Sequence, residues 1–171
     1  GSMTVTDIDL NDTIAATVDS VAITGGNFSG SVPAALTASS NAALKAMLAL
    51  SATGGTSALI ANPASGSDFT WTFTSGSSGD SAFEFLAAGE TLQLTYTVKT
   101  QDNSPDRAGQ EPDFTTSTVT VTVTGTNDAP TITVQTGNSN SASLTETNAG
   151  LSSSGTLTIS DLDLTNTVDV A

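Results

Sequence analysis

Apolar and hydroxyl-bearing residues alternate along several short stretches of the chain. The plainest run is Thr118–Thr124, where Thr alternates with Val, and Phe69–Thr74 and Thr91–Val98 repeat the pattern. Because successive side chains of a strand point to opposite faces, each run predicts a strand with one buried face. Gly, Asn, Ser or Pro clusters bound four further candidate strands, Ala16–Thr24, Thr131–Gln135, Ala142–Leu144 and Thr156–Ser160. So many short strands predict an all-β protein with a β-sandwich architecture.

One segment departs from this period of two. Within Asn41–Leu50, the apolar residues Leu44, Met47 and Leu48 follow the i, i+3, i+4 spacing of a helix. We expect one short inserted helix over about residues 41–50, capped near Asn41 and ended before Gly54. Its apolar side chains are expected to plug an open end of the sandwich.

The chain contains an internal repeat. Thr6–Thr13 reappears as Ser160–Thr167, so that Asp161 lies 154 positions after Asp7. A unit boundary is expected near Gly125–Pro130, where the long alternating run stops at a turn and a proline. The interpretation is a tag-derived scar at residues 1–3, most of one repeat at 4–128, and the opening of the next at 129–171. The alternative is that residues 129–171 fold back and complete a single sandwich.

Composition narrows the classes of function. The chain has 17 acidic residues against three basic ones, and its formal net charge is −14. Such a surface repels a polyanion, which argues against nucleic acid as a partner. The chain has no Cys or His, so thiolate zinc sites and the Ser-His-Asp and Cys-His mechanisms lack their residues. We expect a protein that is not an enzyme, and whose carboxylates share hard cations such as Ca²⁺.

Several motifs together resemble the VCBS repeat of large bacterial RTX-type adhesins. The resemblance rests on Thr126–Pro130, on the Asp-x-Asp-Leu boxes at 7–10 and 161–164, and on Phe85–Leu92 with Leu94–Val98. It covers nearly the whole chain. It implies an immunoglobulin-like or cadherin-like sandwich in tandem array, exported by type I secretion to the bacterial surface or medium and used in attachment and biofilm formation.

The Asp-x-Asp box suits calcium because two aspartates that flank one residue can direct oxygens at one point. By its likeness to cadherin-like arrays, the resemblance implies a junction site of Asn127, Asp128, Asp161 and Asp163, with Glu90 contributed by the first repeat. The matching group at the other end is Asp7, Asp9 and Asp102. The alternative is that these aspartates cap turns by accepting backbone N–H bonds.

These features are compatible with two functions. The first is a calcium-binding extender repeat, which neighbouring repeats of the same polypeptide contact and which projects adhesive domains from the cell. The second is a ligand-binding module that contacts a surface glycan or host protein through the insertion at residues 25–68. The absence of a long apolar run argues against membrane insertion, and an extracellular location is what the resemblance implies.

Overall fold

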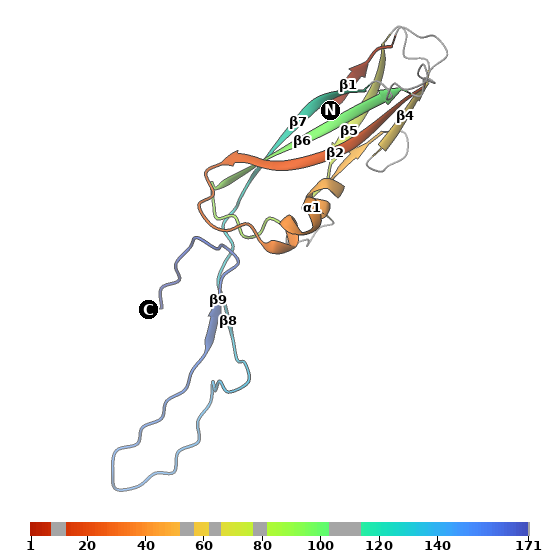
Figure 1. Ribbon diagram of the computed structural model, residues 1–171. Coiled ribbons are helices and arrows are strands. Elements are labelled where there is room, and N and C mark those ends of the chain that lie inside the picture. The colour runs from red at the N-terminus through yellow and green to blue at the C-terminus, as the bar shows by residue number, and fades with distance from the viewer. Residues whose placement is uncertain (8–12, 52–56, 62–65, 77–81, 103–113, 171) are drawn as a thin grey trace.

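The computed structural model describes residues 1–7, 13–51, 57–61, 66–76, 82–102 and 114–170. These residues form nine strands and one helix, and every strand pairing is antiparallel. The prediction of an all-β protein is therefore confirmed. Two sheets make up an upper body, and a thin two-stranded segment extends away from it (Figure 1). We call the described part of residues 1–124 the two-sheet body and residues 129–170 the C-terminal segment.

The larger sheet of the body has four strands in the order β4-β2-β6-β7. Strands β6 and β7 contain two of the alternating runs found in the sequence, β2 contains the candidate strand Ala16–Thr24, and all three extend further than expected. A bulge between Val18 and Ser20 interrupts the pairing of β2 with β6 and leaves Asp19 without an opposite residue. The strands are β2 (Thr13–Gly26), β4 (Ser57–Ala61), β6 (Thr91–Asp102) and β7 (Phe114–Thr124).

The smaller sheet has three strands in the order β1-β5-β3, with bounds β1 (Ser2–Val5), β3 (Leu48–Leu50) and β5 (Ser67–Phe73). Residues 1–3, which the sequence analysis interprets as a tag-derived scar, contribute to this sheet. Ser2 lies opposite Thr70 and Met3 opposite Phe69, and Trp71 and Gly1 exchange two backbone hydrogen bonds. The edge of β5 offers unpaired backbone groups, and any short extended segment can satisfy them.

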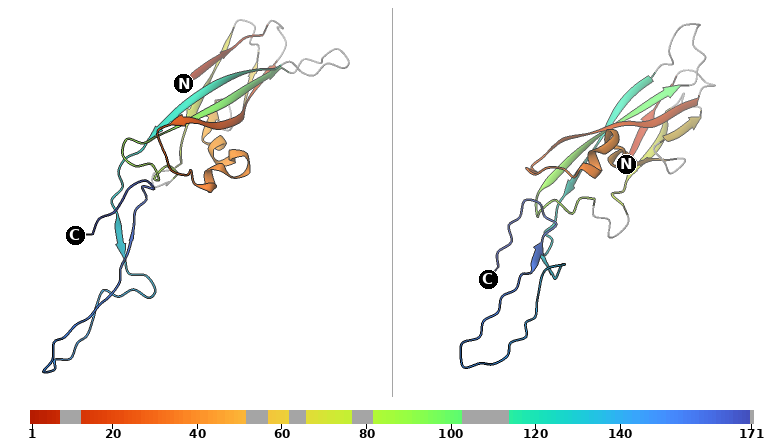
Figure 2. Two further views of the ribbon diagram at one scale, coloured as in Figure 1. Left: turned by 60° about the vertical axis from the view of Figure 1, so that its left-hand side comes forward. Right: turned by 60° about the horizontal axis from the view of Figure 1, so that its bottom comes forward.

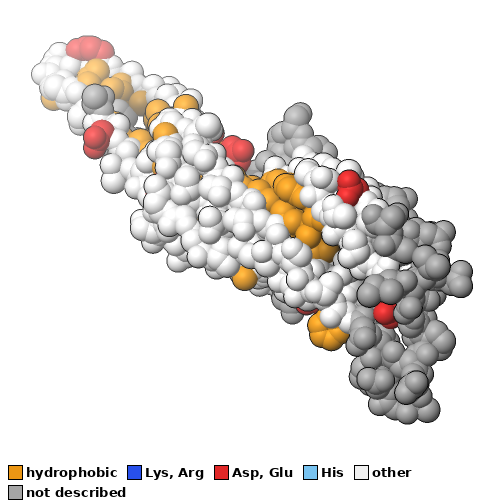
Figure 3. Space-filling model, turned by 90° about the horizontal axis from the view of Figure 1, so that it is seen from above, with side chains coloured by type: hydrophobic (Ala, Val, Ile, Leu, Met, Phe, Trp, Pro, Cys, Tyr) orange, Lys and Arg blue, Asp and Glu red, His pale blue; other side chains and the backbone are white. Residues whose placement is uncertain are grey.

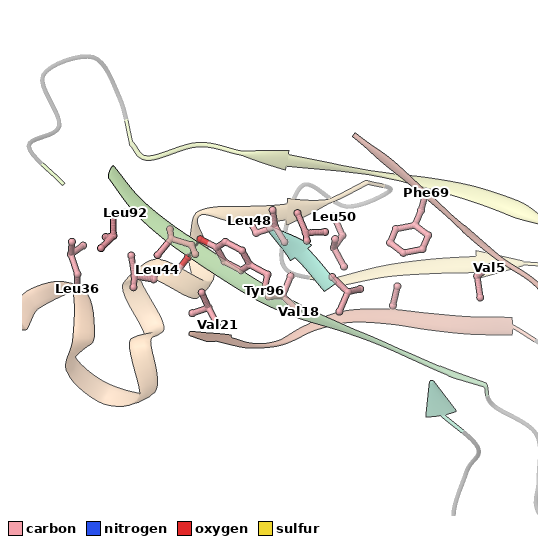
Figure 4. Packing of buried hydrophobic residues seen from close by; sticks show 14 of the residues in the cluster. Val5, Val18, Val21, Leu36, Leu44, Leu48, Leu50, Phe69, Leu92 and Tyr96 are labelled. Carbon is pink, nitrogen blue, oxygen red and sulfur yellow. Dashed lines mark hydrogen bonds between the residues drawn. The ribbon is translucent and has the colours of Figure 1, made fainter. Parts of the chain in front are cut away.

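The apolar core lies between the two sheets. Along β6 the inward positions Leu92, Leu94, Tyr96 and Val98 are buried, and the alternate positions are only partly so. Figure 4 shows Tyr96 pointing across the core toward Leu44, whose carbonyl oxygen accepts a 2.8 Å hydrogen bond from the phenol. This bond satisfies the only polar atom of a fully buried side chain, and burial raises the pKa of Tyr96 to about 12.

The helix begins earlier than expected. Helix α1 spans Ala34–Ala46, directly after Pro33, so the prediction of a helix over 41–50 holds only for its first part. Leu48 and Leu50 instead face the core from strand β3, opposite Phe73 and Trp71. Pairing with β5 overrides the helical spacing, because it buries both leucines and satisfies their backbone groups.

Two side chains of helix α1 form hydrogen bonds with the backbone of β2. Asn41, inside the helix, has a left-handed φ of 57° and donates from Nδ2 to the Val21 carbonyl at 3.1 Å. Lys45 donates to the carbonyl of Asp19, the bulged residue, at 2.8 Å. Asn tolerates this φ better than most residues. Together with the buried Leu36 and Leu44, these bonds make α1 part of the core rather than an appendage.

The C-terminal segment is built differently. Strands β8 (Thr131–Thr133) and β9 (Thr158–Ser160) pair only with each other. Both further views show the segment as an extended ribbon beyond the body (Figure 2). The predicted strand at Ala142–Leu144 does not form, since these residues lie in an irregular stretch. Within the described ranges, no helix is long and apolar enough to cross a bilayer.

Candidate metal centre

Residues 125–128, the linker between β7 and the C-terminal segment, are hydrogen-bonded to the loop of the body at residues 82–90. Gly125 donates its N–H to the Glu90 carbonyl at 2.8 Å and accepts a bond from the Gly89 N–H at 3.2 Å. A Cβ at position 125 would collide with the carbonyl oxygens of Leu86 and Ala87. Only glycine therefore lets the linker lie this close to the loop that carries Glu90.

The second Asp-x-Asp box forms a tight turn after β9. Asp161 Oδ1 accepts a 3.0 Å hydrogen bond from the Asp163 N–H, and the Asn166 N–H donates to the Asp163 carbonyl at 3.3 Å. The first bond is the two-residue contact that aspartates make in Asx turns. This much agrees with the alternative that the box serves as turn chemistry.

Asp163 also has a feature that turn chemistry leaves unexplained. Its side chain is only 2% exposed, the single buried charged residue of the described ranges. Oδ2 accepts hydrogen bonds from the Asp128 N–H at 3.0 Å and from Asn166 Nδ2 at 2.9 Å. Oδ1 is buried and has no hydrogen-bond partner. A buried carboxylate oxygen without a partner is costly, and a bound cation would remove that cost.

Glu90 joins the body to the same turn. Its Oε2 accepts a bond from the Ala87 N–H at 2.9 Å, and its Oε1 accepts one from Thr165 Oγ1 at 2.8 Å. Next to it, the Leu164 N–H donates to the Phe85 carbonyl at 3.2 Å. The turn after β9 is thus held against the loop at residues 82–90.

Asn127 completes the group. Its Oδ1 lies 3.4 Å from the Asn166 amide that also serves Asp163, and its own Nδ2 donates to the Asp128 carbonyl at 2.8 Å. The structure therefore gathers at one end of the body the residues expected at the junction, which are Glu90, Asn127, Asp128, Asp161 and Asp163.

A small cavity of about 110 Å³ lies beside this group. Asp128 and Glu84 are its two acidic lining residues, and Gly125 and Thr126 of the linker also line it. Glu84 was not among the residues expected from the sequence. Its signal was its place between Phe83 and Phe85, as the one acid within the otherwise apolar stretch at residues 82–88.

The second expected group lies at the opposite end of the body. Asp7 follows β1 and Asp102 ends β6, where it stands opposite Ile14 of β2 (Figure 1). Both side chains lie in the described ranges and both have partners. Asp9 lies outside the described residues, so the prediction for this group stays a prediction.

The donors at the junction are all oxygens, from carboxylates, a side-chain amide and the backbone. This set suits hard cations such as Ca²⁺ and Mg²⁺ and does not suit metals that prefer sulfur or nitrogen. Among the described residues, no three carboxylates are already close enough to hold a metal ion by themselves. A cation here would therefore rely on Asp163 together with amide, carbonyl or water oxygens.

In comparisons with known proteins, no family model, curated protein or solved structure matches the chain.

Proposed function

We propose that this chain is a calcium-binding extender repeat of a large bacterial surface or secreted adhesin. In this proposal the two-sheet body is an immunoglobulin-like or cadherin-like sandwich, and the C-terminal segment opens the next repeat of the array. The observation that carries the proposal is the buried Asp163 carboxylate with its unpartnered Oδ1, held between the linker and the following turn.

Charge supports a cation at this position. Asp163 lies within hydrogen-bonding distance of the backbone of Asp128, and its own backbone bonds Asp161. The chain has a formal net charge of −14, so clustered carboxylates repel one another in the absence of counter-charge. Asp163 would be the central ligand, with Asn127, Asp128 and Asp161 as neighbours able to complete the shell and Glu90 in support. A calcium ion there supplies the positive charge that these oxygens lack.

The mechanical consequence follows from which segments meet. Hydrogen bonds join the turn at 161–166 to the linker through Asp128 and Asn127, and to the body through Phe85 and Glu90. Hydrogen bonds contribute about 1 kcal/mol each, and about 1.5–3 kcal/mol where one partner is charged. A cation shared by the same segments would fix the direction in which the C-terminal segment leaves the body. That is the property an extender needs.

The described part of the 25–68 insertion argues for the extender over the ligand-binding module. It supplies core residues from α1, β3 and β4, namely Leu36, Leu44, Leu48, Leu50 and Ile60. Two aromatic residues, Phe28 and Phe114, are candidates for stacking against a glycan. Phe28 packs edge-on against Phe85, with ring centroids 5.0 Å apart. Phe114 is 63% exposed, but it begins strand β7 and lies under the Lys99 ammonium. The absence of His and Cys and of a recognisable pair of catalytic carboxylates supports a role that is not enzymatic.

The test is a calcium titration by calorimetry, with melting followed in parallel in calcium and in chelator. We expect saturable binding and a higher melting temperature in calcium, because a ligand that binds only the folded state stabilises it. Equal melting temperatures in the two conditions would contradict the proposal.

A matched pair of variants locates the site. Asp163→Asn keeps the shape of the side chain and removes its charge, and we expect at least a tenfold loss of calcium affinity. Asp169→Asn makes the same charge change at an exposed position of the same segment and is expected to bind as the unaltered chain does. If both variants lose affinity equally, calcium responds to net charge and not to this site.

A further inference from the structure

Asn166 is the residue of the turn at 161–166 whose side chain contacts the Asp163 carboxylate directly. Its Nδ2 donates to Asp163 Oδ2 at 2.9 Å, and its backbone N–H donates to the Asp163 carbonyl at 3.3 Å. The same amide nitrogen lies 3.4 Å from Oδ1 of Asn127 in the linker. Asn166 was not among the residues expected from the sequence, yet it joins the buried carboxylate to the linker.

The two oxygens of the Asp163 carboxylate have different surroundings. Oδ2 accepts hydrogen bonds from Asn166 Nδ2 at 2.9 Å and from the Asp128 N–H at 3.0 Å. Oδ1 is buried and accepts none. Because two donors already fill the two lone-pair sites of Oδ2, a cation at Asp163 would bind through Oδ1 alone. Asn166 therefore decides how many oxygens of this carboxylate are free for a cation.

No basic side chain of the described ranges serves this carboxylate. Lys45 donates to a backbone carbonyl of β2, and the Lys99 ammonium lies over an aromatic ring of β7. Figure 3 shows the more usual setting on one face of the molecule, where acidic side chains lie singly at the surface. Asp163 is buried instead, and its two donors are neutral. Hydrogen bonds to an ionised group are the strong kind, so these donors can hold the carboxylate without a counter-ion.

The internal repeat contains a natural alternative to this amide. At the spacing of 154 residues, Asn166 corresponds to Asp12 and Asp163 corresponds to Asp9. Asp9 and Asp12 lie outside the described residues, so the comparison concerns sequence alone. An ionised carboxylate has no hydrogen to donate and repels a neighbouring carboxylate, whereas a cation between the two removes that repulsion. Calcium sites also bind more tightly as the number of charged ligands rises. A box with Asp at this position is therefore expected to depend on a cation more than a box with Asn.

We propose that Asn166 is a positioning residue that keeps the turn at 161–166 closed when no cation is bound. Its amide satisfies Oδ2 of Asp163, and a cation adds stability to a turn that already has its shape. With Asp at position 166, the turn closes only when a divalent cation lies between the two carboxylates. This one residue thus sets whether the C-terminal segment is held against the body without a cation or only with one. The cation-dependent part of the inference rests on the proposed function.

The test measures hydrogen exchange of two amides by NMR, in calcium and in chelator. These are the Asp128 N–H, which donates to Asp163, and the Leu164 N–H, which donates to the Phe85 carbonyl. In chelator, Asn166→Asp should raise their exchange rates by at least about tenfold, because a hydrogen bond to a charged group contributes that much. Calcium should restore the protection. Asn166 is itself exposed, so an Asp of the same size fits there.

Two further variants separate the causes. Asn166→Ala removes the donor and adds no charge, so it should lose protection in chelator and regain less than Asn166→Asp in calcium. Asn148→Asp makes the same charge change at an exposed position of the C-terminal segment and should behave as the unaltered chain does. Amides of β6 check that every variant is folded. The proposal is overturned if Asn166→Asp keeps full protection in chelator, or if calcium rescues Asn166→Ala equally well.

Failure of the proposed function would look different. The measurements in chelator need no cation, so they test the positioning role even if calcium does not bind the unaltered chain. If the unaltered chain binds no calcium and calcium does not rescue Asn166→Asp, the proposed function is contradicted and the positioning role stands. If the unaltered chain binds calcium and Asn166→Asp is still not rescued, residue 166 does not set the dependence on a cation, and the inference is overturned.

Discussion

Strands β6 and β8 have the same kind of sequence and different surroundings. In both, Thr alternates with an apolar residue, yet the apolar side chains of β6 are buried and Ile132 of β8 is mostly exposed. The larger sheet meets a second sheet across the core, and β8 meets only β9. An alternating strand thus supplies one apolar face. Whether that face is buried depends on whether another element of the protein packs against it.

The energetic contrast between the two regions is large. In the body, residues of seven strands and a helix pack and hydrogen-bond with one another. The C-terminal segment has only three pairs of opposed strand residues and the contacts of the turn at 161–166. Local stability should therefore fall steeply beyond residue 135.

Hydrogen exchange should show the largest difference. Amides of β6 are expected to exchange only through global unfolding, and those of residues 140–157 at nearly the rate of an unfolded peptide. For a body of ordinary stability, the rates should differ by more than about 1,000-fold. Mass spectrometry of peptide fragments measures this directly. Comparable protection in both regions would show that the segment has packing beyond β8 and β9.

A pair of leucine truncations sharpens the comparison. Leu94→Ala removes a side chain that is 0% exposed and should lower the free energy of unfolding by about 3 kcal/mol. Leu144→Ala removes one that is 53% exposed and should change it by less than about 0.5 kcal/mol. Urea unfolding followed by Trp71 fluorescence measures both. A large loss for Leu144→Ala would break the contrast.

Alkaline pH should weaken the body through Tyr96. Burial raises its pKa to about 12, while in the unfolded chain it titrates near 10. Between these values the unfolded chain loses a proton that the folded chain keeps. Stability is full below pH 10 and falls as the pH rises through 12, by about 3 kcal/mol. Tyr96→Phe lacks this component, and unfolding of both proteins at pH 8.5 and 11.5 isolates it. Parallel losses in the two proteins would contradict the assignment.

Two glycines offer a smaller and more local test. Gly125→Ala places a methyl group against the carbonyls of Leu86 and Ala87 and should cost about 2 kcal/mol. Gly150→Ala meets nothing within 4 Å in the C-terminal segment and should be nearly neutral. Thermal melting of the two variants compares them. If Gly125→Ala is also neutral, the linker can move away from the loop, and the junction is less tightly held than its hydrogen bonds indicate.

The strands with strict alternation were predicted well from sequence, and β2, β8 and β9 overlap candidate strands that turn-forming residues bound. The runs at 91–98 and 118–124 lie within observed strands, and the run at 69–74 does so up to Phe73. Strands β1, β3 and β4 were missed, because each is short and is held by pairing with a longer strand, β5 for β1 and β3 and β2 for β4. Leu48 fitted a helical spacing and became a strand residue when that pairing was satisfied.

The sequence predicted which residues gather at the candidate site, but it did not predict which of them is best placed to bind a cation. The repeat pointed to Asp161 and Asp163 equally, and spacing alone cannot rank them. In the structure Asp161 is partly exposed and bonds the turn, whereas Asp163 is buried with one oxygen unpartnered. Glu84 entered the neighbourhood only through the path of the loop at 82–90.

The sequence by itself determined the period of two, the acidic charge, the absence of Cys and His, and the repeated box that places aspartates after a strand. These are local properties, set by which residues are neighbours along the chain. Tertiary structure alone decided which alternating strands are buried, where the helix begins, and which carboxylate lacks a partner. Each of these depends on segments distant in sequence, because burial and hydrogen-bond satisfaction are properties of what packs against a residue.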